Sequence, residues 1–176
     1  MPDLTFRVSA AKAVYDAKPP SVALLLDIDN RVAGEIVDSI NLRCQIQIET
    51  PRRSYSEDEQ VRLADLFGEP ARWGQTLRPL LWSNLATTVG AFAGTARVRL
   101  MAPCPFDLES GVRRYFDALS GGAVPITLLF SGTVFYETRD GRFQAAPISW
   151  NSEARFAFPV DVWKESTELA MQVGRG

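Results

Sequence analysis

The sequence has no histidine among its 176 residues. Histidine is the usual general base near neutral pH, the activator of serine and cysteine nucleophiles, and a common metal ligand. Only two cysteines are present, Cys44 and Cys104, and two thiolates alone do not complete a zinc site. We therefore expect no metal, no cofactor and no histidine-dependent catalysis, so that an enzyme would have to use carboxylates, lysine or tyrosine.

Clustered positive charge and long apolar runs are missing too. The 19 Lys and Arg residues are spread along the chain, and the formal net charge is −2. The longest apolar run, in Ser21–Ile28, is well short of the roughly 20 residues of a transmembrane helix. Met1–Ala10 shows no basic region followed by an apolar stretch. The sequence thus predicts no nucleic-acid partner, no membrane insertion and a cytoplasmic protein with reduced thiols.

What is present is a strong alternation of apolar and polar residues. Between Ile40 and Glu49, apolar residues face one way while Asn41, Arg43, Gln45 and Gln47 face the other, which is the pattern of a half-buried antiparallel strand. Similar patterns recur seven or eight times, and they do not alternate with helices as in parallel sheets. We predict a mainly-β fold, an antiparallel β-sandwich of immunoglobulin-like or related type with two or three short peripheral helices.

Helix signals are few and well defined. Ser56 and Glu59 form a capping box before an apolar stripe that Gly68 ends, and Asp107 is the expected cap of a second helix. Pro159 is placed to begin a third. The chain is predicted to form a single domain over residues 1–176, with an irregular inserted segment at about 51–82.

The most suggestive catalytic motif is VALLLDIDN at Val22–Asn30. An apolar strand followed by Asp-x-Asp is superficially similar to the nucleophile motif of haloacid-dehalogenase-like phosphatases. That chemistry also needs a flexible turn, a Thr or Ser, a Lys and a later acid pair for magnesium. Because these are not evident, we expect Asp27 to end a strand and to meet water or a neighbouring arginine.

Arg72, Trp73, Arg78 and Trp82 lie in the proline-broken stretch from Asp65 to Asn84 and are the candidate partner-binding residues. Trp and Arg often anchor protein interfaces, which suggests a protein partner or self-association. The alternative is that these aromatics close over an open end of the sandwich. For the two thiols, we expect Cys44 on the buried face of its strand and Cys104, between two prolines, to be more exposed.

Several segments also resemble a known family. LRCQIQIE followed by RRSYS, then DLFGEPARWGQTLRPLLWS and later LLFSGTVFY, are similar to uncharacterised bacterial proteins that are common in actinobacteria and associated with nickel-iron hydrogenase gene neighbourhoods. The resemblance implies a cytoplasmic accessory or assembly role beside a redox enzyme, and no site residues.

The function that we predict is therefore a non-enzymatic interaction or accessory protein. A sandwich that binds a small ligand between its sheets, and a carboxylate-dependent hydrolase, are the alternatives.

Overall fold

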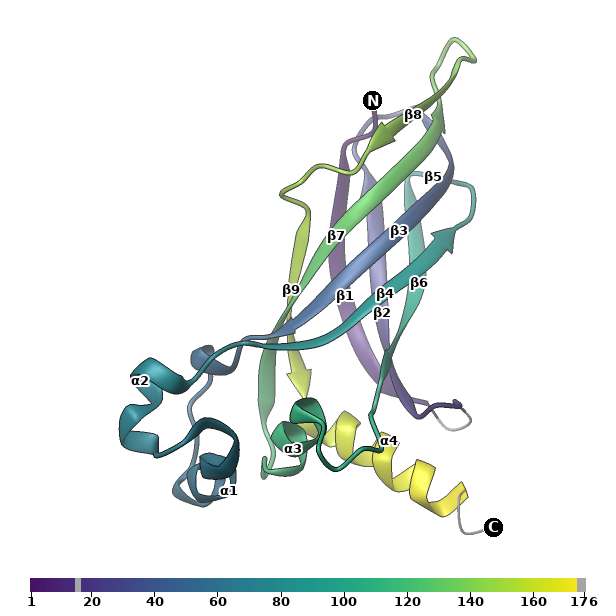
Figure 1. Ribbon diagram of the computed structural model, residues 1–176. Coiled ribbons are helices and arrows are strands. Elements are labelled where there is room, and N and C mark those ends of the chain that lie inside the picture. The colour runs from purple at the N-terminus through teal and green to yellow at the C-terminus, as the bar shows by residue number, and fades with distance from the viewer. Residues whose placement is uncertain (15–16, 174–176) are drawn as a thin grey trace.

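The computed structural model describes residues 1–14 and 17–173, with side chains up to Glu168. Two antiparallel sheets face each other, and helices gather at one end of them (Figure 1). The strands are β1 (Leu4–Ala13), β2 (Ser21–Asn30), β3 (Ile36–Ile48), β4 (Leu80–Val89), β5 (Phe92–Ala93), β6 (Thr95–Pro103), β7 (Ala123–Glu137), β8 (Phe143–Pro147) and β9 (Glu153–Pro159). The predicted mainly-β sandwich is confirmed.

The smaller sheet has the order β1-β2-β6, and the larger has the order β4-β3-β7-β8. β5 pairs with β3, and β9 pairs with β7 beyond the end of β8. β7 therefore has β3 on one side and both β8 and β9 on the other. At Gly132 of β7, φ is +129°, and a Cβ atom would lie 1.9 Å from the Asn41 carbonyl oxygen, so this close approach of β7 to β3 requires glycine.

The core lies between the sheets. On β3, Leu42, Cys44, Ile46 and Ile48 are each at most 2% exposed, as their alternation predicts. They pack with the inward side chains of β2, in particular Leu24 and Leu26, which are fully buried. A small ligand bound between the sheets, the alternative function predicted above, would have to enter this interior.

The described residues form four α-helices and two short 3-10 helices, where two or three helices were expected. They are η1 (Thr50–Arg52), α1 (Glu57–Phe67), η2 (Pro70–Arg72), α2 (Trp73–Thr76), α3 (Gly111–Asp117) and α4 (Val160–Val173). The capping box of Ser56 and Glu59 begins α1, and Gly68 is its C-cap, both as predicted. α4 follows β9 directly and lies across the end of the sheets (Figure 1).

The prediction that Asp107 caps a helix is wrong. Ser110 is the N-cap of α3, with its Oγ accepting a hydrogen bond from the Arg113 N–H at 3.4 Å. Asp107 instead stabilises the preceding turn, in which its carboxylate accepts the N–H of Glu109 at 2.9 Å. Two cap-forming side chains three positions apart compete for the same helix start, and the turn between them decides which is used.

Candidate functional site: the outer face of the larger sheet

The segment singled out in the sequence divides between core and surface. Trp82 lies on β4 and is 6% exposed, with its ring centroid 5.1 Å from those of Phe116 and Phe158. Its Nε1 donates to the Pro103 carbonyl oxygen at 2.8 Å. Trp82 is therefore a core side chain and does not offer a surface to a partner, because a β-bulge at this position turns it inward.

The side chain of Trp73 is partly exposed. Its ring makes edge contacts with Tyr55 and Phe67, and its Nε1 donates to the Gly68 carbonyl oxygen at 2.9 Å. It covers α1, whereas the alternative prediction placed these aromatics over an open end of the sandwich. Arg72 and Arg78 are exposed. The structure does not gather the four residues into one surface.

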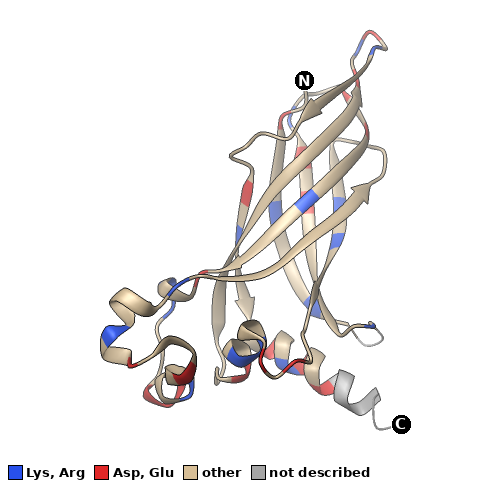
Figure 2. Ribbon diagram, in the orientation of Figure 1, with Lys and Arg blue, Asp and Glu red and all other residues tan. Residues whose placement is uncertain are grey.

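A different surface stands out by its lack of charge. We call the β3 face the outward side chains of three adjacent strands: Asn84, Ala86 and Thr88 of β4; Asn41, Arg43, Gln45 and Gln47 of β3; and Leu129, Ser131 and Thr133 of β7. Arg43 is the one charged residue of this set, and its cross-strand neighbours are Ala86 and Ser131. These strands are mostly tan in Figure 2, whereas the strands of the smaller sheet carry several charged bands.

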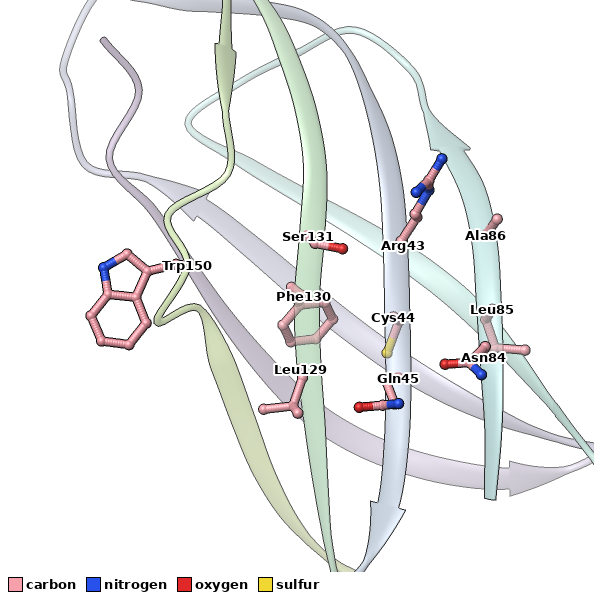
Figure 3. A pocket seen from close by; sticks show the side chains of 10 residues that line it. All are labelled: Arg43, Cys44, Gln45, Asn84, Leu85, Ala86, Leu129, Phe130, Ser131 and Trp150. Carbon is pink, nitrogen blue, oxygen red and sulfur yellow. The ribbon is translucent and has the colours of Figure 1, made fainter. Parts of the chain in front are cut away.

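The β3 face is also hollowed. A concavity of about 560 Å³ is lined by Arg43, Gln45, Asn84, Ala86, Leu129 and Ser131, with Cys44, Leu85 and Phe130 beneath and Trp150 at its rim (Figure 3). Among the described residues, Arg43 and Asn84 have no side-chain hydrogen bond or ion pair, while Gln45 accepts from the Nε2 of Gln47 at 3.3 Å. Unused donors and acceptors therefore line an open hollow.

Trp150 is 93% exposed, and the backbone turn that carries it is tied to β7. It lies in the turn Ser149–Ser152 between β8 and β9, closed by a 3.0 Å hydrogen bond from the Ser152 N–H to the Ser149 carbonyl oxygen. On one side the N–H of Ile148 donates to Gly132 of β7, and on the other Phe130 of β7 donates to Ser152. Trp150 is not among the contact residues predicted from the sequence, although a Trp within the polar run Ser149–Ser152 was a usable signal.

The sequence of residues 1–172 matches the model of a family of unknown function, DUF6084. The chain belongs to this family. Membership agrees with the resemblance to an uncharacterised family, and it assigns no activity. Among curated proteins, none matches the sequence of this DUF6084 chain.

Two solved structures share a weak likeness with the DUF6084 chain. β-Glucosidase 3B from Thermotoga neapolitana, in complex with α-D-glucose, is 12% identical, with a TM-score of 0.30 over 89% of this chain and 17% of that one. A β-glucosidase from Kluyveromyces marxianus is 11% identical, with a TM-score of 0.29 over 90% of this chain and 15% of that one. The chain thus spans about a sixth of either enzyme, and the likeness is too low to support an argument about function.

The Asp-x-Asp motif of the DUF6084 chain lies on β2, on the outer face of the smaller sheet. Asp27 lies between two arginines, at 2.9 Å from Arg97 Nε and 3.3 Å from Arg7 Nη2. The hydrogen bond from Arg97 and the charges of both arginines lower its pKa, against the opposing effect of burial. A carboxylate held by two cations is a poor nucleophile, and this arrangement is the neighbouring-arginine contact that we expected for Asp27.

Both cysteines of the DUF6084 chain are buried, at 2% exposure each. The expectation that Cys104 is more exposed is wrong, because its N–H donates to the carbonyl oxygen of Pro20 at 2.7 Å, which fixes the residue beside the start of β2. Burial raises the pKa of each thiol to about 12. Neither cysteine is therefore a reactive thiolate at neutral pH.

A buried ion pair ties α1 to the sheets. Arg53 donates to both carboxylate oxygens of Glu59, at 3.2 and 3.1 Å, and to the Gly121 carbonyl oxygen at 2.6 Å. The N–H groups of Ser56 and Ser120 also donate to Glu59. Burial disfavours the carboxylate, but these hydrogen bonds outweigh it and lower the pKa of Glu59 to about 2. With every polar atom satisfied, this pair has a structural role.

Neither a cluster of metal ligands nor a membrane-spanning helix is found in the described part of the chain. No group of three or more Cys, Asp or Glu side chains there is arranged to hold a metal ion. None of its helices combines the length and apolarity that crossing a membrane requires.

Proposed function

We propose that this protein is a non-enzymatic interaction protein that assembles with another polypeptide through the β3 face. The observation that carries the proposal is the difference between the two outer faces of the sandwich (Figure 2). The smaller sheet places Asp27 between Arg7 and Arg97, an arrangement suited to a solvated surface. The β3 face presents neutral side chains around Arg43, with Trp150 beside them. Depletion of charge around an aromatic anchor is typical of the centre of protein interfaces.

The chemistry of the remaining groups supports a role without catalysis. The sequence has no histidine, the Asp27 carboxylate is held by arginines, and burial raises the pKa of both thiols to about 12. The hollow on the β3 face carries an arginine and amides but no carboxylate. It offers hydrogen-bond donors and acceptors for recognition, and no carboxylate, lysine or tyrosine that could act as an acid or base.

For the cellular role, we propose a cytoplasmic accessory protein of an actinobacterial-type family. The resemblance to proteins of nickel-iron hydrogenase gene neighbourhoods makes a hydrogenase-type redox complex the first assembly to test. Arg72, Arg78 and the accessible edge of Trp73 form a second proposed contact, at the helical end. Trp82 is not part of this proposed contact because its side chain is buried.

Site-specific photo-crosslinking in the native host tests the proposal. Leu129 of the β3 face is replaced by p-benzoylphenylalanine, and the matched control carries the same residue at Ser9, which is exposed on β1 of the opposite sheet. We expect irradiation to give a discrete protein adduct from position 129 and none from position 9. Equal adducts from both positions, or no adduct from position 129, would refute the proposal.

A further inference from the structure

The β3 face carries both a projection and a hollow. Trp150 projects from the turn between β8 and β9, and Figure 3 shows its indole pointing away from Arg43 and Asn84. The hollow of about 560 Å³ extends across β7 and β3 to β4. The indole therefore does not fill the hollow of its own chain. A surface with a projection and a recess side by side can pair with a copy of itself, each projection entering the other recess.

The charges on this side of the sheet suit such a pairing. Arg43 has no ion pair or side-chain hydrogen bond among the described residues, and its neighbours Ala86 and Ser131 are neutral. A guanidinium in this situation is attracted to the face of an indole. On β9, Glu153 and Arg155 pair with each other at 3.8 Å, so these two strand positions add no net charge.

The area is sufficient for a stable contact. The larger sheet is four strands wide at most levels, and β3 is 13 residues long. With strands about 4.8 Å apart and a rise of about 3.3 Å per residue, the whole outer side of this sheet measures roughly 800 Å², and the β3 face is its central part. A stable protein interface buries about 800 Å² on each partner. The exposed apolar side chains Ile36, Leu81, Leu129 and Phe143 lie on the strands of this sheet.

We propose that the polypeptide covering the β3 face is a second copy of this chain, related by a twofold axis. Trp150 of each subunit occupies the hollow of the other and stacks on the Arg43 guanidinium there. This inference rests on the proposed function, since it names the occupant of the same surface. A redox-enzyme partner would then meet the dimer elsewhere, for example at the helical end.

Reciprocal crosslinking tests the geometry. In a twofold pair, residue 150 of one copy lies beside residue 43 of the other, so a mixture of Arg43→Cys and Trp150→Cys proteins should be joined by a short bismaleimide. Each variant alone should react far less, because its introduced thiols are not opposite each other. Ser9→Cys mixed with Trp150→Cys is the matched control. Since Cys44 and Cys104 are buried, the unmodified protein is the blank.

Sedimentation equilibrium supplies the second measurement. We expect the unmodified protein to be a dimer at micromolar concentration, and Trp150→Ala to raise the dimer dissociation constant at least tenfold. Diluted below their dissociation constants, the two proteins should melt at the same temperature, because only the dimer contact differs between them. A monomeric unmodified protein, or crosslinking of the Arg43→Cys and Trp150→Cys mixture no stronger than the Ser9→Cys control, would overturn the inference. A monomer that still gives an adduct from position 129 with a different protein keeps the proposed function, whereas loss of that adduct removes both.

Discussion

Replacing Glu59 by Gln should weaken the attachment of α1 to the sheets. The variant leaves Arg53, whose side chain is only 10% exposed, without its counter-charge. Removing one member of a buried ion pair costs about 3 to 5 kcal/mol, and a glutamine that keeps part of the hydrogen bonding should reduce this to about 2 to 3 kcal/mol. Urea unfolding at pH 7, followed by tryptophan fluorescence and circular dichroism, measures the difference.

The pH dependence gives an independent check of the same reasoning. The pKa of Glu59 falls from 4.5 to about 2 on folding, so the unfolded chain takes up the proton first as the pH drops. The stabilisation is therefore complete above about pH 5 and is lost progressively as the pH falls towards 2. Between pH 7 and pH 3, a shift of this size corresponds to about 2 kcal/mol. The Glu59→Gln variant has no carboxyl group at this position, so its stability lacks this pH-dependent contribution.

The gap in stability between the unmodified protein and Glu59→Gln should therefore narrow by about 2 kcal/mol from pH 7 to pH 3. Glu57→Gln is the matched control, because Glu57 is exposed in the same first turn and acts only on the helix dipole, worth about 0.5 kcal/mol. If the gap is unchanged at pH 3, the hydrogen bonds to Glu59 do not lower its pKa.

Four further outcomes follow from the same structure. Cys44→Asp should lower the free energy of unfolding by about 3 kcal/mol or more, since it buries an unpaired charge, and a wild-type melting curve would contradict this placement. Trp82→Ala should cost about 3 to 5 kcal/mol in chemical denaturation and Trp73→Ala clearly less, because Trp82 is buried whereas Trp73 is partly exposed. Asp27→Asn should leave turnover of p-nitrophenyl phosphate at the background of the unmodified protein; a loss specific to the variant would restore the phosphatase reading. Elemental analysis should find no stoichiometric transition metal, and one tightly held zinc, nickel or iron per chain would refute that expectation.

Much of the fold follows from clear local patterns in the sequence. The strict alternation from Leu42 to Ile48 leaves one register in which the core is apolar, and the reciprocal contacts of Ser56 and Glu59 mark the start of α1. The predictions were wrong where the local pattern does not specify the structure. Trp82 lies in an unbroken apolar run, so the bulge that turns its ring inward leaves no trace in the pattern. The prolines on either side of Cys104 indicate a loop, and they do not show what covers it.

The candidate site could not be assembled from the sequence in the same way. Arg43 was correctly placed on the polar side of its strand, but its neighbours Ala86 and Ser131 come from strands far away in the chain. Pairing partners of this kind depend on topology, which alternation does not specify. Trp150 becomes significant only once β8 and β9 are seen to share β7, since that arrangement places their connecting turn beside the hollow.

The pairing of β3 with β7 has a consequence for biosynthesis. Cys44 of β3 pairs with Phe130 of β7, roughly 90 residues later in the chain. At translation rates of about 5 to 20 residues per second, β7 leaves the ribosome on the order of 5 to 20 s after β3. During that interval β4 can cover only one edge of β3, and the apolar row from Leu42 to Ile48 lacks the strand that completes its sheet. Nascent chains of this protein should therefore depend on holdase chaperones, and slower translation between β4 and β7 should reduce the soluble yield more than slower translation after β7.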